Sequence, residues 1–439
     1  MDITIEKLIY GGDGLARLPA DEHGRGKAVF VPFVLAGERV TVDVAEERTG
    51  FARASLAKVV GPSPRRTVPP CPYFGQCGGC HYQHTSYEHQ LEIKAAILQE
   101  TLHRTAKLTL DTPLQVHSAE PWQYRNRTRM KVRTAPEFEL GYFRHGSHDL
   151  LPVEECPISS PLINRTVDIL WQVGRSATVP TSVREVQFFA NHDDTQILLE
   201  IYIDRAADPD SLRLFAEKLR SALPAIIGVV VFESVRGSDE ENDRAPLTSS
   251  RSGPGKAFGA DSLTYRAAGH DYRVSAGAFF QTNRFLADEL VRVALRDLKG
   301  STALDLYAGT GLFSLPLAAN FERVTAVEAA PYSFADLKHN ARRNVKPMRA
   351  TTEQYLAQSA RSRFDLVIVD PPRNGLGEKS ARALGRMSVP HVTYVSCDPA
   401  TLSRDLRVLV ESGFRVEEAH LVDLFPQTFH MESVFHLVR

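Results

Sequence analysis

The chain has 439 residues, of which 43% are hydrophobic and 24% charged, and its formal net charge is −1. At roughly 150 residues per domain, this length predicts two or three domains, each able to bury a core. The balanced charge excludes a global positive field, so any contact with nucleic acid has to come from a local patch. The N-terminus is acidic and alternating, unlike a signal peptide, and no apolar run approaches the ~20 residues that span a bilayer. We therefore expect a cytoplasmic protein without membrane contact.

Residues 1–62 have the pattern of short strands separated by turns. Two β-rich runs, 28–34 and 39–44, flank Ala36-Gly37, and glycines at 11–14 punctuate the first pair of strands. So many short strands in so little chain are typical of a small barrel of the OB type, with a generic β-domain as the alternative. A linker rich in proline and arginine follows at 62–70.

Next comes a loop rich in proline, glycine and cysteine. Three cysteines are spaced C-x5-C-x2-C, and a fourth is followed by a proline further along the chain. In a reducing compartment such thiols are more often metal ligands than disulfides. The candidate ligands are Cys71, Cys77, Cys80 and Cys156. Four thiolates can hold either a tetrahedral zinc ion or a 4Fe-4S cluster, and the spacing alone does not decide between them. His81 and His84 are possible substitutes but read better as ordinary loop histidines.

The stretch from 63 to 275 mixes helices and strands. Apolar residues at helical spacing predict a helix over 87–102, and the pattern predicts a strand at 196–203 and a helix at 209–219. Residues 124–133, which lie between the first of these helices and the strand, alternate cations with smaller side chains. On a strand the cations would share one face. These cations are Arg125, Arg127, Arg129, Lys131 and Arg133. Like charges in a row repel unless an anion meets them, which favours a track for RNA phosphates over a row of ion pairs.

From about residue 276, helices alternate with apolar strands, which predicts a doubly wound parallel sheet. The strand 303–306 runs into Gly309-x-Gly311, a turn at which the backbone can approach a ligand closely. Glu328 ends the next apolar run, and a carboxylate in that position can accept hydrogen bonds from two ribose hydroxyls. Together these features favour a nucleoside site over a solvated strand end.

Two further strand ends complete the pattern. A buried strand ends in Asp370-Pro371-Pro372, a motif typical of methyltransferases, and the prolines make the turn after it rigid. The strand 392–395 leads into Ser396-Cys397-Asp398-Pro399, so Cys397 is expected at the same edge of the sheet. A small core cysteine is the alternative, but a polar loop beside a ligand favours a nucleophile.

A thiol makes chemical sense in a methyltransferase that acts on a pyrimidine. Carbon 5 is a poor nucleophile until a thiolate adds to carbon 6, and carbon 5 can then attack an electrophilic methyl group. A base must next remove the carbon-5 proton before the thiol leaves. Glu432 is the candidate base, although spacing alone would fit a surface glutamate.

The chain closely resembles the RNA (uracil-5-)-methyltransferase family over nearly its whole length. The resemblance rests on Phe280-Gln281-Thr282-Asn283, 305–311, 370–373, 396–406 and 423–432, with Thr282 where valine is frequent. It implies S-adenosylmethionine as cofactor, Gln281, Tyr307, Glu328 and Asp370 as its contacts, Cys397 as nucleophile and Glu432 as base. It also favours a 4Fe-4S cluster over zinc on the four cysteines.

The resemblance implies an α/β fold in three parts. These are a TRAM domain of OB type at 1–62, a central α+β domain with the iron–sulfur loop at 63–275, and a Rossmann-like class I methyltransferase domain at 276–439. The expected reaction is methylation of carbon 5 of a uridine in structured RNA, most of all 23S rRNA, with tRNA as the alternative. Rivals are cytosine-5 methylation, which Glu432 and the motif around Cys397 disfavour, and a noncatalytic RNA-binding iron–sulfur protein. No obligate protein partner is evident.

Overall fold

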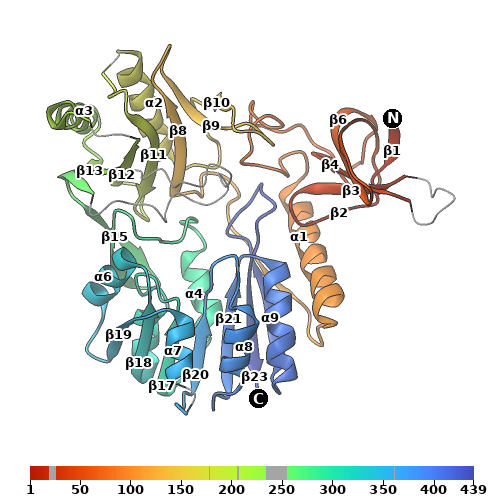
Figure 1. Cartoon of the computed structure of the whole chain (residues 1–439), viewed down its shortest axis with the longest axis vertical. Coiled ribbons are helices and arrows are strands. Elements are labelled where there is room, and N and C mark those ends of the chain that lie inside the picture. The colour runs from red at the N-terminus through yellow and green to blue at the C-terminus, as the bar shows by residue number, and fades with distance from the viewer. Residues whose placement is uncertain (19–25, 177, 205–206, 234–254, 360) are drawn as a thin grey trace.

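The computed structural model of the chain describes residues 1–18, 26–176, 178–204, 207–233, 255–359 and 361–439. Its strands gather into an N-terminal, a middle and a C-terminal sheet, which occupy three separate regions of the molecule in Figure 1. None of the helices within these described residues is long and apolar enough to cross a membrane.

The N-terminal sheet has the strand order β1-β5-β6-β4-β3-β2. Its alternating side chains bury a small separate core that includes Val29, Val31 and Val40. The expected run of short strands over 1–62 is thereby confirmed. The strands are β1 (Asp2–Thr4), β2 (Lys7–Leu8), β3 (Asp13–Arg17), β4 (Ala28–Pro32), β5 (Arg39–Glu47) and β6 (Phe51–Gly61).

The middle sheet has the order β10-β9-β8-β11-β12-β13-β14, and helices α2 (Pro161–Arg175) and α3 (Pro209–Ala222) share a core with it. Other strand residues, such as Phe189 and Tyr202, belong to the core that continues into the C-terminal region. The strands are β8 (Arg127–Arg133), β9 (Glu139–Phe143), β10 (Leu150–Pro152), β11 (Val183–Ala190), β12 (Ile197–Ile203), β13 (Ile226–Glu233) and β14 (Lys256–Gly259). A hairpin of β15 (Ser262–Ala267) and β16 (His270–Ser275) leads on to the C-terminal sheet.

The C-terminal sheet has the order β19-β18-β17-β20-β21-β23-β22-β7. Its first five strands in that order are parallel, and β23 runs antiparallel to both of its neighbours. The strands are β7 (Gln115–His117), β17 (Gly300–Leu306), β18 (Phe321–Glu328), β19 (Val345–Arg349), β20 (Leu366–Val369), β21 (His391–Ser396), β22 (Arg415–Val422) and β23 (Glu432–Val438). The predicted doubly wound sheet is confirmed, because the chain leaves β17 toward β18 and β19 and returns on its other side at β20.

Helices cover both faces of this sheet, which explains why its strands are apolar throughout rather than alternating. The helices are α4 (Ala287–Leu295), α5 (Ser314–Asn320), α6 (Pro331–Asn340), α7 (Thr352–Gln358), α8 (Gly377–Gly385) and α9 (Pro399–Glu411). In β20, for example, all of Leu366–Val369 is buried.

The segment that contains α1 and β7 packs on the C-terminal sheet, although the predicted domain boundaries place it in the central domain. The predicted helix over 87–102 is confirmed as α1 (Tyr87–Thr101), which continues as a π-helical turn over Leu102–Ala106. Although 63–275 was expected to form the central domain, Ile97 and Leu102 pack into the core around β21 and α9, and β7 pairs with β22. Figure 1 shows α1 beside α9, between the N-terminal and C-terminal sheets. Hydrophobic periodicity predicts such a helix but not the sheet on which it packs.

Candidate active site

Cys397 lies in the turn between β21 and α9, at the edge where the parallel strands of the C-terminal sheet end. Asp398 caps the helix, because its carboxylate accepts the N–H groups of Ala400 and Thr401 at 3.0 and 2.9 Å. Pro399 occupies the first turn, where its missing N–H costs nothing. The cap and the proline hold the backbone directly after the thiol in one conformation.

Glu432 is the first residue of β23 and faces the same turn. Ser433 pairs with Ser396 in the antiparallel ladder, so the next pair along brings Glu432 beside Cys397. Glu432 is 4% exposed, unlike the surface glutamate that spacing alone would fit, and its Oε1 has no hydrogen-bond partner among the described residues. Because a buried carboxylate oxygen without a partner is costly, this atom is suited to meet a proton that a ligand brings.

A third acid, Asp370, follows β20 at the same edge. Burial raises the pKa of Asp370 to about 7, and burial together with the charge of Asp370 raises the pKa of Glu432 well above its ordinary value. Burial, then the charges of Glu432 and Asp370, raise the pKa of Cys397 to about 12, against an opposing effect of Arg373. The thiol is therefore neutral near pH 7, even though it lies next to the N-terminus of α9.

The strand order reverses between β17 and β20, and sheets of this kind bind nucleosides beyond the strand ends at such a point. Tyr307 and Gly309, just beyond β17, have positive φ angles of 62° and 56°, so the chain turns sharply there. The Glu328 carboxylate at the end of β18 accepts the N–H groups of Gly309 and Ala330 at 2.8 and 2.6 Å. Each of its oxygens keeps one lone pair for a ligand hydroxyl, so these residues fit the ribose of S-adenosylmethionine.

Gln281 reaches this region through the loop that precedes α4. Asn283 anchors that loop, because its amide donates to the Leu424 carbonyl at 3.1 Å, eight positions before Glu432 in the chain. Gln281 itself is 6% exposed. The structure therefore brings Tyr307, Glu328, Asp370, Cys397 and Glu432 to one end of the C-terminal sheet, and it places Gln281 in a loop that is anchored to the segment before Glu432.

Comparisons with known proteins agree with this geometry. The family model described as tRNA (Uracil-5-)-methyltransferase matches residues 86–439, and a TRAM domain model matches residues 1–57. The chain belongs to the tRNA (uracil-5-)-methyltransferase family. It is an RNA (uracil-5-)-methyltransferase.

Two relatives and one solved structure are similar to this chain over nearly its whole length. The methyltransferase is 33% identical to a 23S rRNA (uracil(1939)-C(5))-methyltransferase of Chromohalobacter salexigens, over 100% of this chain and 89% of the relative. It is 31% identical to an uncharacterized RNA methyltransferase of Aquifex aeolicus, over 99% and 97% of the two chains. The tRNA (uracil-54, C5)-methyltransferase of Pyrococcus abyssi, solved with S-adenosyl-L-homocysteine, covers 100% of both chains with a TM-score of 0.76 and 23% identity. That structure confirms the class I methyltransferase fold.

The four cysteines of the methyltransferase line one cavity of about 70 Å³, beside α2. Hydrophobic side chains such as Tyr73 and Val153 complete its wall, and His81 and His84 are not among the described residues that line it. Burial raises the pKa of the Cys77 thiol to about 11 and that of Cys80 still further. Four sulfurs around one cavity fit a metal centre, and a metal would have to displace the protons that burial keeps on Cys77 and Cys80.

The five basic residues of 124–133 do not form an open track. Arg125 lines the cysteine cavity, and the other four lie on β8 with their side chains on one face, as the alternation predicts. That face meets carboxylates of neighbouring strands: Arg127 pairs with Glu200, Arg129 and Lys131 with Glu185, and Arg133 with Glu139. RNA binding was expected here because a row of cations needs anions to offset its repulsion. The protein supplies those anions itself, so the main support for RNA binding at β8 is lost. Sequence periodicity could not show this, because the acids lie on β9, β11 and β12.

Tyr10 is a residue of the site that the sequence did not reveal. It belongs to the N-terminal sheet region, yet its hydroxyl donates to the carbonyl of Cys397 at 3.2 Å, and its ring packs edge-on against Phe429. Nothing in the local sequence around Tyr10 signals a partner 387 positions away. Asp305 was also missed: it is fully buried at the end of β17, accepts the Ser314 hydroxyl, and has its pKa raised to about 7 by burial.

A buried ion pair fixes the segment that leads to Glu432. The Lys94 ammonium of α1 donates to Asp423 at 2.6 Å and to the Phe425 carbonyl at 2.9 Å, and both charged side chains are 0% exposed. Gln427, further along this segment, exchanges hydrogen bonds of 2.9 Å with Gln90. The site thus depends on α1, a helix that the sequence assigns to another domain.

Replacement of Lys94 by methionine is expected to lower the free energy of unfolding by about 3–5 kcal/mol, because it leaves Asp423 charged and buried without a partner. Urea unfolding followed by circular dichroism measures the change. The exposed Lys58→Met variant is the matched control and is expected to shift the free energy by less than about 0.5 kcal/mol. Equal effects of the two substitutions would contradict a stabilising role of the pair.

Proposed function

We propose that this methyltransferase modifies a uridine of 23S rRNA at carbon 5, with Cys397 as nucleophile and Glu432 as base. The observation that carries the proposal is the juxtaposition of a half-buried thiol and a buried carboxylate with an oxygen that has no partner among the described residues, beside Asp370. A noncatalytic RNA-binding protein has no use for three acidic groups whose pKa values are all raised by a shared, desolvated site.

S-adenosylmethionine, when bound, supplies an electrophilic methyl group. We propose Gln281, Tyr307, Glu328 and Asp370 as the residues that hold it. The last three stand at the ends of neighbouring strands where the strand order reverses, and the family resemblance adds Gln281. The Cys397 thiol gives its proton to solvent, and the thiolate adds to carbon 6 of uracil. The carbon 5–carbon 6 double bond opens into an enolate, which makes carbon 5 nucleophilic. After methylation, Glu432 accepts the proton from carbon 5, and the bond between Cys397 and carbon 6 breaks to release the product. The target base has to leave its stack to reach a thiol placed this deep.

The choice of 23S rRNA rests on the relative from Chromohalobacter salexigens, whose name gives that substrate. A tRNA substrate is the second candidate, because the matching family model and the Pyrococcus abyssi enzyme both carry tRNA in their descriptions. The deciding measurement is a map of 5-methyluridine in total RNA with and without the gene. Loss of one 23S rRNA site is expected, whereas loss of a tRNA site alone would favour the second candidate.

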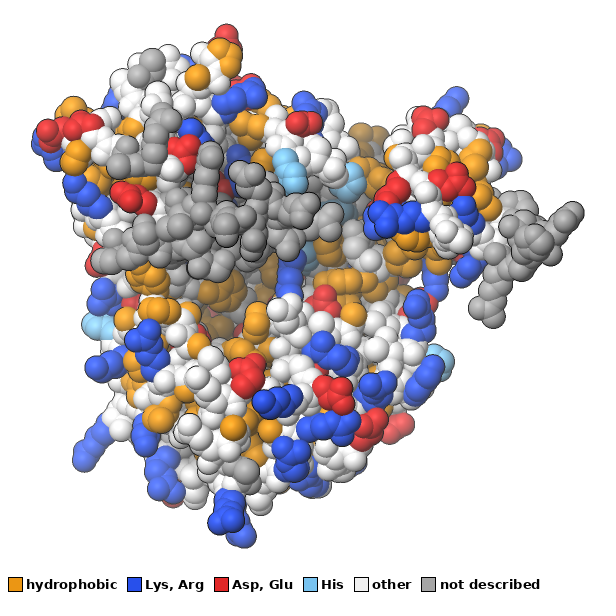
Figure 2. Space-filling model, viewed as in Figure 1, with side chains coloured by type: hydrophobic (Ala, Val, Ile, Leu, Met, Phe, Trp, Pro, Cys, Tyr) orange, Lys and Arg blue, Asp and Glu red, His pale blue; other side chains and the backbone are white. Residues whose placement is uncertain are grey.

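We propose that RNA reaches the site across a groove of about 570 Å³ between the N-terminal sheet and the cysteine loop. Its wall includes the rings of Phe33, Phe74 and His145 and the guanidinium of Arg144, an aromatic and cationic combination found on nucleic-acid surfaces, while Glu38 already pairs with the neighbouring Arg66. Among the described residues, the Arg144 guanidinium donates to one partner, the neutral Gln76 amide oxygen at 3.0 Å, so its charge is available to a phosphate. Figure 2 shows further lysine and arginine side chains dispersed over the C-terminal part of the same view. Binding through β8 stays a prediction that the ion pairs make less favourable.

We propose that Cys71, Cys77, Cys80 and Cys156 hold a 4Fe-4S cluster that ties residue 156 to the 71–80 loop. All four cysteines line one cavity of about 70 Å³, which supports a shared metal centre, and the family resemblance favours the cluster over zinc. Purified protein is expected to contain about four irons per chain and to absorb broadly near ~400 nm. Cys156→Ser is expected to lose the colour. A colourless protein with one zinc per chain would refute the iron assignment.

A further inference from the structure

The tip of the hairpin formed by β2 and β3 reaches from the N-terminal sheet to the turn that carries the nucleophile. Gly11 and Gly12 follow Tyr10 with positive φ angles of 111° and 94°, so the chain reverses sharply and leaves Tyr10 at the projecting end. The Tyr10 hydroxyl donates to the Cys397 carbonyl at 3.2 Å. Burial, and then the charge of Asp398, raise the pKa of Tyr10 above its ordinary value, so the hydroxyl keeps its proton for this bond.

Aromatic packing fixes the ring of Tyr10. It meets Phe429 edge-on, with 5.5 Å between ring centroids, and Phe429 in turn meets the His81 ring at 4.7 Å. Gly12 lies so close to His81 that a Cβ on this glycine would be 2.8 Å from the imidazole. The tip is therefore held on both sides by packed rings, and the position of the Tyr10 hydroxyl is set by the fold itself.

The hydrogen bond matters because of the peptide on which it acts. The peptide between Cys397 and Asp398 directly follows the thiol-bearing residue. Its N–H donates to the Ser396 hydroxyl at 3.2 Å, and its carbonyl accepts from Tyr10. These contacts lie at opposite ends of one planar unit, so together they oppose its rotation relative to the Cys397 side chain. Without Tyr10, the remaining contact is to a hydroxyl that can itself rotate.

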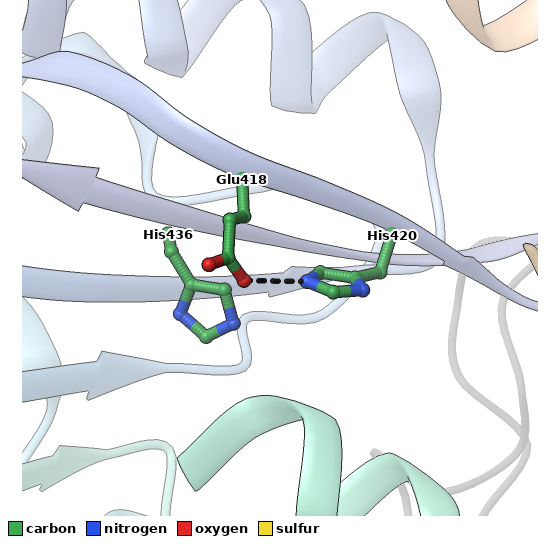
Figure 3. Close-up of side chains that lie close together, drawn as sticks. All are labelled: Glu418, His420 and His436. Atoms are coloured by element: carbon green, nitrogen blue, oxygen red, sulfur yellow. Dashed lines mark hydrogen bonds and ion pairs between the residues drawn. The ribbon is translucent and has the colours of Figure 1, made fainter. Parts of the chain in front are cut away.

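The strand that leads to the nucleophile is fixed independently of Tyr10. In β21, Thr393 Oγ1 lies 3.1 Å from Nδ1 of His436 on β23, and Nε2 of that ring donates to the Val293 carbonyl of α4 at 3.0 Å. Figure 3 shows His436 gathered with Glu418 and His420 of the adjacent strand β22. The cap of α9 fixes the other side of the turn. The peptide between these two fixed ends is the part that the N-terminal sheet holds.

We propose that Tyr10 is a positioning residue of the methyltransferase, whose hydroxyl holds the peptide after Cys397 so that the thiol points at carbon 6 of uracil. The proposal rests on the proposed function, because it requires Cys397 as the nucleophile. Reacting atoms have to approach to about 3–3.5 Å in alignment, and a misplacement of about 1 Å can cost on the order of 10²-fold in rate. The N-terminal sheet is then part of the reaction site as well as a candidate surface for RNA.

The test variant is Tyr10→Phe, which keeps the ring against Phe429 and removes only the hydroxyl. The probe is RNA that contains 5-fluorouridine, with excess S-adenosylmethionine. At saturating RNA, the rate of covalent-complex formation is expected to fall by about 10–100-fold. The RNA concentration that gives half the maximal rate, and the affinity for S-adenosylmethionine, are expected to stay unchanged. A loosened N-terminal sheet would weaken RNA binding instead, so this split separates positioning from a general structural role.

The matched control is Lys7→Met in the same hairpin. Lys7 lies on β2 and pairs with Glu100 of α1, so its loss also removes a contact of the N-terminal sheet, but one at the surface, where the two side chains are 41% and 36% exposed. Its rate is expected to equal that of the wild type, because exposed ion pairs contribute little. An equal fall in Tyr10→Phe and Lys7→Met would assign the effect to docking of the sheet and would overturn the proposal.

A second variant, Ser396→Ala, tests the other end of the same peptide. It is expected to slow the same step. Combined with Tyr10→Phe it should cost less than the product of the two single effects, because both side chains hold one peptide. Effects that multiply in full would show that the two side chains act on separate units, against the proposal.

The wild type and Cys397→Ala separate failure of this proposal from failure of the proposed function. If the wild type forms the covalent complex, Cys397→Ala does not, and Tyr10→Phe reacts at the wild-type rate, only the role of Tyr10 is refuted. If the wild type forms no complex, or Cys397→Ala forms one, the proposed function fails and the role of Tyr10 fails with it.

Discussion

Cys397→Ala is expected to abolish methyl transfer while leaving the affinity for S-adenosylmethionine unchanged. Loss of a covalent nucleophile has cost on the order of 10⁶-fold in other enzymes, because every later step depends on the first bond. No other described cysteine can replace Cys397, since the remaining four line a separate cavity beside α2. Transfer of labelled methyl groups to RNA measures activity, and calorimetric titration measures cofactor binding.

RNA that contains 5-fluorouridine tests the same residue in a different way. Fluorine cannot leave carbon 5 as a proton, so the wild type is expected to stop as a covalent complex that survives denaturing electrophoresis. The Cys397→Ala variant should form no such complex. A covalent complex in that variant would show that another group adds to carbon 6.

Glu432→Gln is expected to slow turnover by about 10²–10⁴-fold, the range for loss of a general base. Because the base acts after the thiol has added, this variant should accumulate the covalent complex with ordinary uridine RNA, which the wild type resolves. Glutamine keeps the shape of the side chain and is uncharged in a buried position that already disfavours charge, so folding is not expected to suffer. Denaturing electrophoresis and methyl-transfer rates measure the two effects together.

The matched control is Glu411→Gln, an exposed glutamate at the end of α9. Its rate should equal that of the wild type. If Glu432→Gln lost activity without accumulating the complex, Glu432 would act before the addition step, and another base would have to remove the carbon-5 proton.

Much of the active site could be predicted because its residues follow buried strands. Parallel strands of one sheet end at one edge, so the apolar runs before Tyr307, Glu328, Asp370 and Cys397 already imply that these residues meet. The position of Glu432 could not be predicted in this way. It depends on the antiparallel register of β23 against β21, which no pattern in either strand specifies alone.

Contacts between segments far apart in the chain were the main features of the site that the sequence did not predict. Tyr10 reaches Cys397 from the N-terminal sheet, and Lys94 pairs with Asp423 from a helix that sequence periodicity cannot assign to a sheet. For the row of cations at Arg127–Arg133, the sequence instead predicted a contact with RNA that the structure makes less favourable. The alternation correctly predicts one basic face, but the carboxylates that neutralise it come from other strands, so charge in one segment is poor evidence of what that segment binds.

The setting of Cys397 has a consequence for survival of the enzyme under oxidative stress. Peroxides and alkylating agents attack thiolates, and the raised pKa of about 12 leaves almost none at neutral pH. Burial first, and the two nearby carboxylates second, therefore keep this thiol in its less reactive, protonated form.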